Sequence, residues 1–293
     1  MSNTAHDSFI TFKKQFTLMK IQKSRYLLFA CLLGIFSASN AQVKTPYGDN
    51  TAAGKYYNVR GIKLYTEVYG SGKPLLLIHG NGGSMGNFAG TIPYFAKKYK
   101  VIAVDSRAHG KSKDSRDSLS FEMMADDFAG LLDAMHVDSA YVIGWSDGGI
   151  NALELAMRHP DKVIKLAATG ANLWPDSTGL IPSYWKQEQK DYEAKKNTVF
   201  KTAKEKNDWK VFLLDWFQPN IKLAELKAIK CPSLIIGGDH DLIPTQHTVL
   251  IAQNIPNAYL WIVPNSGHGT LIEHRDEFNQ KVDEFFTTPF KKR

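Results

Sequence analysis

Short, continuously apolar runs recur along the chain between residues 75 and 263. They cover residues 75–78, 101–104, 140–143, 163–168, 234–236 and 260–263. Apolar runs of this length are expected of parallel strands that are buried on both faces of a sheet. Segments with a helical period lie between them, most clearly residues 121–135, where Phe121, Met124, Phe128 and Leu132 share one face. The pattern therefore predicts strands that alternate with helices.

Alternating strands and helices with right-handed crossovers predict a mostly parallel, doubly wound sheet covered by helices on both sides. Residues 56–59 and 62–69 flank the dipeptide Arg60-Gly61, which is typical of a β-hairpin at the edge of a sheet. The fold class predicted from the pattern is thus α/β.

The regular alternation stops at residue 169, and about 60 residues rich in aromatic side chains follow without a strand. We expect a helical cap at about residues 170–230. An insertion after a central strand lies over the crevice where α/β sheets bind ligands. We therefore expect Trp174 and Trp216 to reach the substrate pocket, and most other aromatic residues of this segment to pack the cap together.

The N-terminal segment has the features of a secretory signal peptide. Basic residues between positions 20 and 25 precede an apolar run at 27–36, and the small residues Ser39 and Ala41 suit cleavage before Gln42. Ten apolar residues are too few to cross a bilayer, which takes about 20. We expect residues 1–41 to be removed on export to the periplasm or the medium, with no stable membrane anchor. Met19 is the expected true start, because it begins a segment of ordinary signal length.

The expected mature chain, residues 42–293, is less basic than the full sequence. Residues 1–41 contain five basic residues and one acidic residue, so their removal lowers the formal charge from +7 to +3. The lysines between Lys186 and Lys210 are typical of a solvated helical face, because no aromatic-interleaved binding motif accompanies them. We expect no nucleic-acid partner.

Cys231 is the single cysteine of the expected mature chain, so no intramolecular disulfide is expected. The 252 residues of that chain suffice for one α/β domain with a cap.

The sequence Gly-Trp-Ser-Asp-Gly at residues 144–148 follows an apolar run and precedes a helical segment. A strand that turns at once into a helix strains the residue at its apex, and flanking glycines leave room for the crossing chains. We predict that Ser146 stands at such a nucleophile elbow, exposed above the sheet. The alternative is a glycine-rich turn with a solvated serine.

A serine becomes a nucleophile when an imidazole lies within hydrogen-bond reach and a carboxylate fixes that imidazole's tautomer. His268 lies in a glycine-flanked loop after the last predicted strand, and Asp239 and Asp241 follow the strand before it. Carboxyl ends of parallel strands share one edge of the sheet, so we expect these residues to meet Ser146 there. Spacing does not separate Asp239 from Asp241 as the acid.

The tetrahedral intermediate of such a reaction needs two preorganised hydrogen-bond donors. The sequence His-Gly-Asn-Gly-Gly at residues 79–83 follows a buried strand and offers the backbone N–H of Asn81, and the N–H of Asp147 opens the next helix. The glycine-rich stretch lacks the remaining signals of a phosphate loop. A metal site built from Asp239, His240 and Asp241 is not expected, because adjacent residues point apart and the sequence offers no second ligand cluster, so we predict no metal and no cofactor.

Four motifs together resemble those of the α/β-hydrolase superfamily over residues 56–286. They lie at residues 79–82, 105–112 and 144–149, and at 238–241 with 267–268. The resemblance implies the α/β-hydrolase fold, makes Asp241 the triad acid, and makes the stretch at 105–112 a structural turn. Gly-Trp-Ser-Asp-Gly-Gly-Ile and the later Gly-Ala-Asn at 170–172 are similar to the branch that contains valacyclovir hydrolase, which cleaves α-amino-acid esters.

A carboxylate beside the nucleophile opposes the developing oxyanion unless a cation offsets it. One hypothesis is that Asp147 faces the pocket and binds a substrate ammonium, as the branch resemblance implies. The other is that its side chain points away and accepts backbone N–H groups at the helix start.

The sequence as a whole predicts an exported serine hydrolase acting on a small-molecule carboxylic ester through an acyl-enzyme. Alternatives with the same triad are amide, lactone or carbon–carbon bond hydrolysis and perhydrolysis. An alternative of another class is a hydrolase-fold receptor with negligible turnover.

Overall fold

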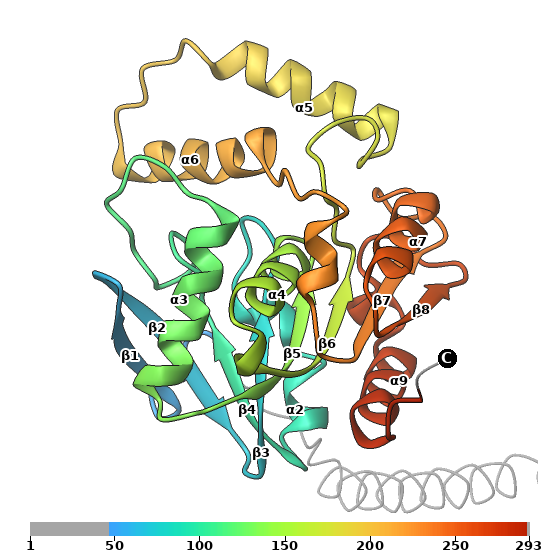
Figure 1. Ribbon diagram of the computed structural model, residues 1–293. Helices are drawn as coiled ribbons and strands as arrows, with labels where there is room; N and C mark the ends of the chain where they lie inside the picture. Colours follow the sequence, from blue (N-terminus) through green and yellow to red (C-terminus); the bar gives the residue numbers. More distant parts are fainter. Residues whose placement is uncertain (1–46, 292–293) are drawn as a thin grey trace, which may run out of the picture. The chain divides into compact units, whose positions relative to one another are not determined.

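An eight-stranded sheet forms the centre of the computed structural model, which describes residues 47–291 (Figure 1). The strands are β1 (Gly54–Val59), β2 (Ile62–Tyr69), β3 (Lys73–Ile78), β4 (Tyr99–Val104), β5 (Ala140–Trp145), β6 (Val163–Thr169), β7 (Ser233–Gly238) and β8 (Ala258–Val263). They lie in the order β1-β2-β4-β3-β5-β6-β7-β8. The expected signal peptide, its cleavage site after Ala41 and the start at Met19 lie outside the described residues.

The sheet is mostly parallel, as predicted. Strands β3 to β8 pair in parallel, whereas β2 runs antiparallel to both β1 and β4. The β1–β2 hairpin turns at Arg60 and Gly61, whose φ angles are 46° and 84°. Two positive φ angles are what a two-residue turn needs to match the twist of its strands. The predicted hairpin is therefore confirmed.

Helices cover both faces of the sheet. The α-helices are α2 (Ile92–Phe95), α3 (Phe121–Ala134), α4 (Asp147–Arg158), α5 (Pro182–Lys195), α6 (Ala203–Phe217), α7 (Thr245–Asn254), α8 (Thr270–Glu273) and α9 (Arg275–Thr287), and the 3-10 helices are η1 (Met85–Phe88), η2 (Pro160–Lys162) and η3 (Glu225–Ala228). In the described residues, 47–291, none of these helices is long and apolar enough to cross a membrane.

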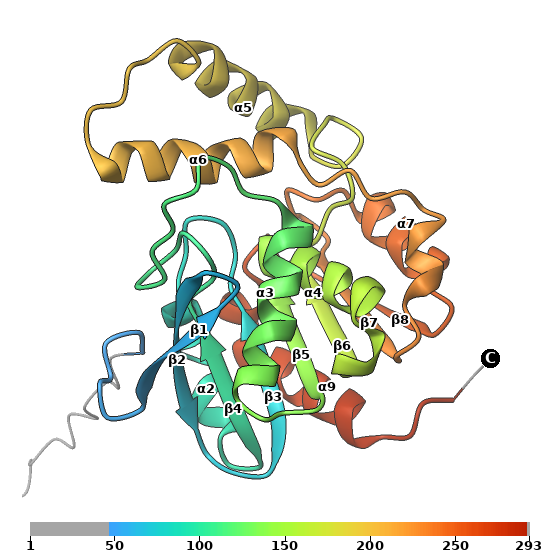
Figure 2. The same ribbon diagram turned by 60° about the vertical axis from the view of Figure 1, so that its left-hand side comes forward.

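Alternation along β3 shows how the two faces are filled. Leu76 and Ile78 belong to the core on the side of α3 and α4, whereas Leu75 and Leu77 belong to the core on the side of α2 and α9, and all four side chains are fully buried. Successive side chains of a strand point to opposite faces, so a strand covered on both sides is continuously apolar. Figure 2 shows α3 and α4 in front of the strands.

Strand β8 departs from this pattern. Its apolar run predicted a strand buried on both faces, but most of its residues are half-buried and Leu260 is 43% exposed. The prediction is wrong here because β8 is the last strand of the sheet and pairs with β7 alone among the described strands. Strand position, which a run of apolar residues does not encode, decides the burial.

The segment between β6 and β7 carries the helices α5 and α6, which lie beyond the carboxyl ends of the strands (Figure 1). Helix α5 buries no side chain. Its contact with α6 is aromatic: the ring of Trp216 stacks on Trp185 at 4.9 Å and on Tyr192 at 4.5 Å between centroids. Such parallel, stacked rings join the two helices into one cap.

Helix α6 is fastened to the body of the domain by hydrogen bonds. Asn207 Nδ2 donates to the carbonyl of Ala108 at 2.8 Å, and Lys210 Nζ donates to the carbonyl of Arg116 at 2.9 Å. Lys210 is buried and also forms an ion pair with the buried Asp114 at 3.2 Å. These contacts hold α6 over the loop that follows β4.

Replacing Lys210 by Met should lower the free energy of unfolding by about 2 kcal/mol, because a buried charged hydrogen-bond network loses its donor. Urea denaturation followed by circular dichroism measures the change. Lys206→Met on the exposed side of the same helix is the matched control and should have little effect. Equal stabilities of the two variants would contradict this description of how the cap is anchored.

Candidate active site

Ser146 occupies the turn between β5 and α4 with φ 58° and ψ −124°, a strained conformation for a residue other than glycine. The flanking glycines make this turn possible. A Cβ on Gly148 would lie 1.9 Å from the carbonyl oxygen of Ile78, and one on Gly144 would lie 2.0 Å from the carbonyl oxygen of Gly148. Helix α4 can therefore start directly above β5, which places Ser146 at the carboxyl edge of the sheet.

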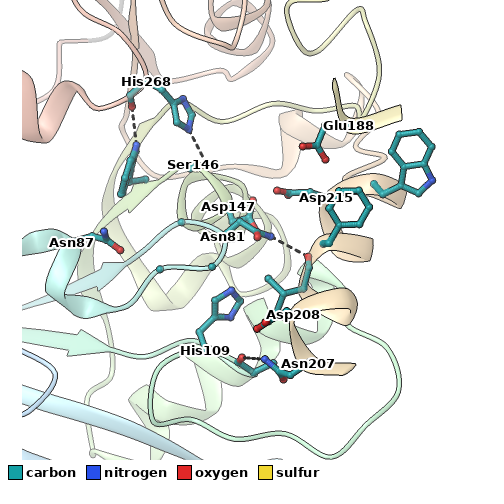
Figure 3. A pocket seen from close by; sticks show the side chains of 18 of the residues that line it. Asn81, Asn87, His109, Ser146, Asp147, Glu188, Asn207, Asp208, Asp215 and His268 are labelled. Atoms are coloured by element: carbon teal, nitrogen blue, oxygen red, sulfur yellow. Dashed lines mark hydrogen bonds between the residues drawn. The ribbon is translucent and has the colours of Figure 1, made fainter. Parts of the chain in front are cut away.

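Ser146, His268 and Asp241 form one hydrogen-bonded chain. Ser146 Oγ lies 2.9 Å from His268 Nε2 (Figure 3), and His268 Nδ1 lies 2.7 Å from Asp241 Oδ1. The Asp241 side chain is fully buried, whereas the imidazole is partly accessible. With Nδ1–H held by the carboxylate, Nε2 presents its lone pair to the serine hydroxyl, the arrangement that proton abstraction requires.

Asp239, the other acid that the sequence left open, lies apart from this chain. Its carboxylate accepts from His240 Nδ1 at 2.7 Å and from the backbone N–H of Ser266 at 3.1 Å. The backbone hydrogen bond from Asn265, followed by the one from the His240 side chain, lowers the pKa of Asp239 to about 2. Asp241 is thus the carboxylate in contact with His268.

Two residues from the motifs at 144–148 and 170–172, to which the sequence assigned no role of their own, enclose His268. Trp145 Nε1 donates to the His268 carbonyl at 2.8 Å, and the indole lies beside the imidazole with 5.9 Å between ring centroids. Gly170 has a φ of 64°, and a Cβ there would lie 2.8 Å from His268 Cε1. The imidazole therefore fits between the elbow and the end of β6.

The loop that follows β3 passes close to the serine. A Cβ on Gly80 would lie 2.9 Å from Ser146 Cβ. His79 fixes this loop, because its Nδ1–H donates to the Gly80 carbonyl at 2.8 Å and its Nε2 accepts the Ser106 N–H at 3.0 Å. Burial lowers the pKa of His79 to about 4, so the ring is neutral.

Two backbone donors near Ser146 have no backbone partner. Within residues 47–291, neither the N–H of Asn81 nor that of Asp147 donates to a backbone carbonyl. These are the two N–H groups that the sequence suggested for the oxyanion. They flank the serine from the β3 loop and from the first turn of α4.

A cavity of about 1190 Å³ opens above the serine between the sheet edge and the cap. Its wall includes Ser146, His268, Asn81 and Asp147 from the body of the domain. The cap contributes Tyr184, Trp185, Glu188, Asn207, Asp208, Phe212, Asp215 and Trp216. The pocket is therefore built from both parts of the fold, with the cap supplying most of its tryptophan, tyrosine and phenylalanine residues.

The two tryptophans expected in the pocket differ in position. Trp216 is among the residues that line the cavity, but Trp174 is not. The indole N–H of Trp174 donates to the Ile221 carbonyl at 3.0 Å, and its ring meets His247 edge-on at 5.0 Å between centroids. The expectation for Trp174 is wrong, because its ring packs against α7 instead of turning under the cap.

The Asp147 side chain faces the cavity. It is 4% exposed, and its Oδ2 accepts Asn81 Nδ2 at 2.9 Å. The same Asn81 Nδ2 donates to the Val211 carbonyl of α6 at 3.2 Å. The Asp147 carboxylate thus contacts the β3 loop and lies beneath the cap, instead of accepting N–H groups at the start of its own helix.

Two carboxyl groups of the cap face Asp147: Asp215 from α6 and Glu188 from α5 (Figure 3). Asp215 lies in hydrogen-bonding contact with Asp147, and burial together with the Asp147 charge raises the pKa of Asp215 well above its usual range. Burial likewise raises the pKa of Glu188, whose carboxyl contacts the Tyr184 hydroxyl. No sequence signal predicted this cluster, since both residues lie on helices without a clear apolar stripe.

His109 is a further pocket residue that the sequence did not indicate, because the stretch at 105–112 was expected to be structural. Asp105 has that role: its carboxylate accepts the N–H groups of Met85 and Lys111. His109 lines the cavity, donates from Nδ1 to the Arg107 carbonyl at 2.8 Å, and is buried. In the described part of the chain its Nε2 has no hydrogen-bond partner.

Comparison with known proteins identifies the family. The family model described as alpha/beta hydrolase fold matches residues 73–188. Serine hydrolase BPHL of Mus musculus is 31% identical over 245 residues, which cover 78% of this chain and 84% of that protein. The chain belongs to the α/β-hydrolase family. This hydrolase is also 29% identical over 268 residues to 2-hydroxymuconate semialdehyde hydrolase of Pseudomonas sp. (strain CF600), covering 77% of this chain and 90% of that protein.

A solved structure shares the fold of this hydrolase. The enol-lactonase from Burkholderia xenovorans LB400 superposes with a TM-score of 0.65 at 22% identity, covering 80% of this chain and 100% of that chain. Since the named relatives differ in substrate, the family fixes the fold and the hydrolytic class, and the pocket has to indicate the rest.

The raised pKa of Asp215 predicts a stability change. An aspartate in the unfolded chain ionises at a lower pH, so the native state loses stability as the pH rises from the ordinary aspartate pKa through the raised one. At pH 8, Asp215→Asn should therefore raise the free energy of unfolding, because the amide removes the cost of ionising a buried carboxyl. Thermal and urea unfolding between pH 4 and 8 measure this.

Asp208→Asn is the matched control for that comparison, because Asp208 lies on the same helix and pairs with Lys204 at its exposed surface. It should not show the same gain in stability with rising pH. A loss of stability in Asp215→Asn at pH 8 would contradict the inferred cost of ionising Asp215.

Proposed function

We propose that this chain is an exported serine hydrolase that cleaves a small carboxylic ester whose acyl group carries an amine. The observation that carries the proposal is the Ser146–His268–Asp241 chain, which opens into a cavity walled by carboxyl groups. Export rests on the signal-like segment at residues 1–41.

In the proposed reaction Ser146 Oγ attacks the ester carbonyl while His268 Nε2 takes the hydroxyl proton. Asp241 keeps the imidazole in the required tautomer and stabilises the imidazolium that forms. The tetrahedral intermediate collapses, its C–O bond to the alcohol breaks, and His268 returns the proton to the leaving alcohol. A water molecule then attacks the acyl-enzyme by the same route and releases the acid and free Ser146.

Negative charge on the former carbonyl oxygen would be stabilised by the backbone N–H groups of Asn81 and Asp147. A preorganised donor of this kind contributes on the order of 3 kcal/mol to the transition state. The neutral His79 supports this function, because its two hydrogen bonds hold the Asn81 loop against Ser146. The strained turn at Ser146 likewise holds the Asp147 N–H beside the serine.

We infer an amine on the substrate from the negative charge beside this oxyanion hole. The Asp147 carboxylate belongs to the same residue as one of the donors, and its charge opposes the developing oxyanion unless a cation offsets it. In residues 47–291 no Lys, Arg or His side chain forms an ion pair with Asp147. A substrate ammonium would supply that cation, whereas a carboxylate-bearing substrate would be repelled.

Asp147→Asn should separate amine recognition from catalysis. The amide keeps the backbone donor and the hydrogen bond with Asn81 but loses the charge. We expect kcat/KM for norleucine methyl ester to fall about 10- to 100-fold, the scale of one charged hydrogen bond. Turnover of methyl hexanoate, which has the same carbon chain without the amine, should fall less or rise.

Ser146→Ala is the control for the reaction itself, and it should abolish turnover of both esters while circular dichroism shows an unchanged fold. Equal losses on the two esters in Asp147→Asn would rule out recognition of the amine. Undiminished turnover in Ser146→Ala would overturn the proposed mechanism.

A further inference from the structure

Negative charge in the pocket exceeds what one ammonium can neutralise. Asp147 on α4, Glu188 on α5 and Asp215 on α6 point their carboxyl groups toward the same space (Figure 3). None of the three forms a salt bridge with a basic side chain in residues 47–291. Asp147 and Asp215 are in hydrogen-bonding contact, so a proton between them leaves that pair with one negative charge. One bound ammonium would neutralise this pair and leave the Glu188 carboxylate without a counter-charge.

Among the described residues, the basic residues nearest this cluster form no ion pair with it, and Lys204, which also lines the cavity, pairs with Asp208. Asn81 donates one amide hydrogen to Asp147, and the Tyr184 hydroxyl contacts Glu188. At longer range, Asp191 adds negative charge and Lys195 adds positive charge near Glu188. Burial first and neighbouring negative charge second raise the pKa of both carboxyl groups, with Asp191 acting on Glu188 and Asp147 acting on Asp215.

His109 provides an independent indication of the ligand. The ring points from its loop toward Asn81 and Asp147 (Figure 3). Only 5% of the residue is exposed, so it is more than nine-tenths buried. Its Nδ1–H donates to the Arg107 carbonyl, and burial lowers its pKa to about 4, so Nε2 is an acceptor. That acceptor has no partner among residues 47–291. An unpaired buried acceptor in a pocket wall favours a ligand rich in N–H donors.

An organic cation fits this cluster better than a metal ion. Across the described residues, no three His, Cys, Asp or Glu side chains are arranged to hold a metal. An ammonium brings three hydrogen-bond donors that can reach carboxyl groups on different elements without a fixed coordination geometry. The cavity of about 1190 Å³ also exceeds a small acyl group, so a long basic side chain and a leaving alcohol can be bound together.

We propose that the substrate is an ester of a basic amino acid, with its α-ammonium between Asp147 and Asp215 and its side-chain ammonium at Glu188. This rests on the proposed function and adds the second cation. Because α5 supplies Glu188, the cap would set the preference for a basic side chain while the elbow and α6 bind the α-amine.

Three methyl esters with the same six-carbon acyl chain test this. Lysine methyl ester carries both ammonium groups, norleucine methyl ester carries the α-ammonium alone, and methyl hexanoate carries neither. We expect wild-type kcat/KM for the lysine ester to exceed that for the norleucine ester about tenfold, mainly through KM, as an added charged contact would give. In Glu188→Gln this ratio should fall to about one.

Glu193→Gln is the matched control, because Glu193 lies on the same helix as Glu188 but is exposed and pairs with Lys196. It should keep the wild-type ratio. A wild-type ratio of one or less, or a ratio unchanged by Glu188→Gln, would overturn the second cation site. If the wild-type enzyme hydrolyses the norleucine ester in that experiment, the proposed function stands; if it hydrolyses none of the three esters, the proposed function fails as well.

Discussion

The close crossing of α4 over the central strands is the contact on which the site depends. Gly144 and Gly148 approach neighbouring backbone so closely that no Cβ fits at either position, and this crossing holds Ser146 in a backbone conformation that costs about 1–3 kcal/mol. The surrounding core supplies that energy through apolar side chains buried on both faces of the sheet. A strained serine and a preformed donor at the start of α4 are two results of one packing constraint.

The cap supplies the part of the pocket wall that lies opposite the sheet edge. Helix α6 is fixed to the loop after β4 and to the Asn81 loop, so its Asp215 reaches the same space as Asp147. Helix α5 is held through stacked aromatic rings and buries no side chain, yet it contributes Glu188 and Tyr184 to the wall. Catalytic geometry and pocket charge thus come from different layers of the fold, which lets relatives share the first and differ in the second.

Sequence periodicity predicted the fold well where burial is uniform. The central strands, the hairpin at Arg60-Gly61 and helix α3 follow from their own patterns, and the meeting of Ser146 with His268 follows from the shared edge of a parallel sheet. The prediction failed at β8, since a run of apolar residues does not show that a strand lies at an edge. It also failed at Trp174, and it gave no sign of Asp215 or His109, because packing between distant elements decides which polar residues of the cap and the β4 loop enter the pocket. The catalytic roles themselves stay predictions.

Covalent labelling with a fluorophosphonate is the most direct measurement of the central claim, because such probes react with a serine that an adjacent imidazole activates. Peptide mapping by mass spectrometry of the labelled, folded protein should find one adduct, on Ser146, and replacement of His268 by Ala should prevent its formation. An adduct on another residue, or equal labelling without His268, would contradict the account.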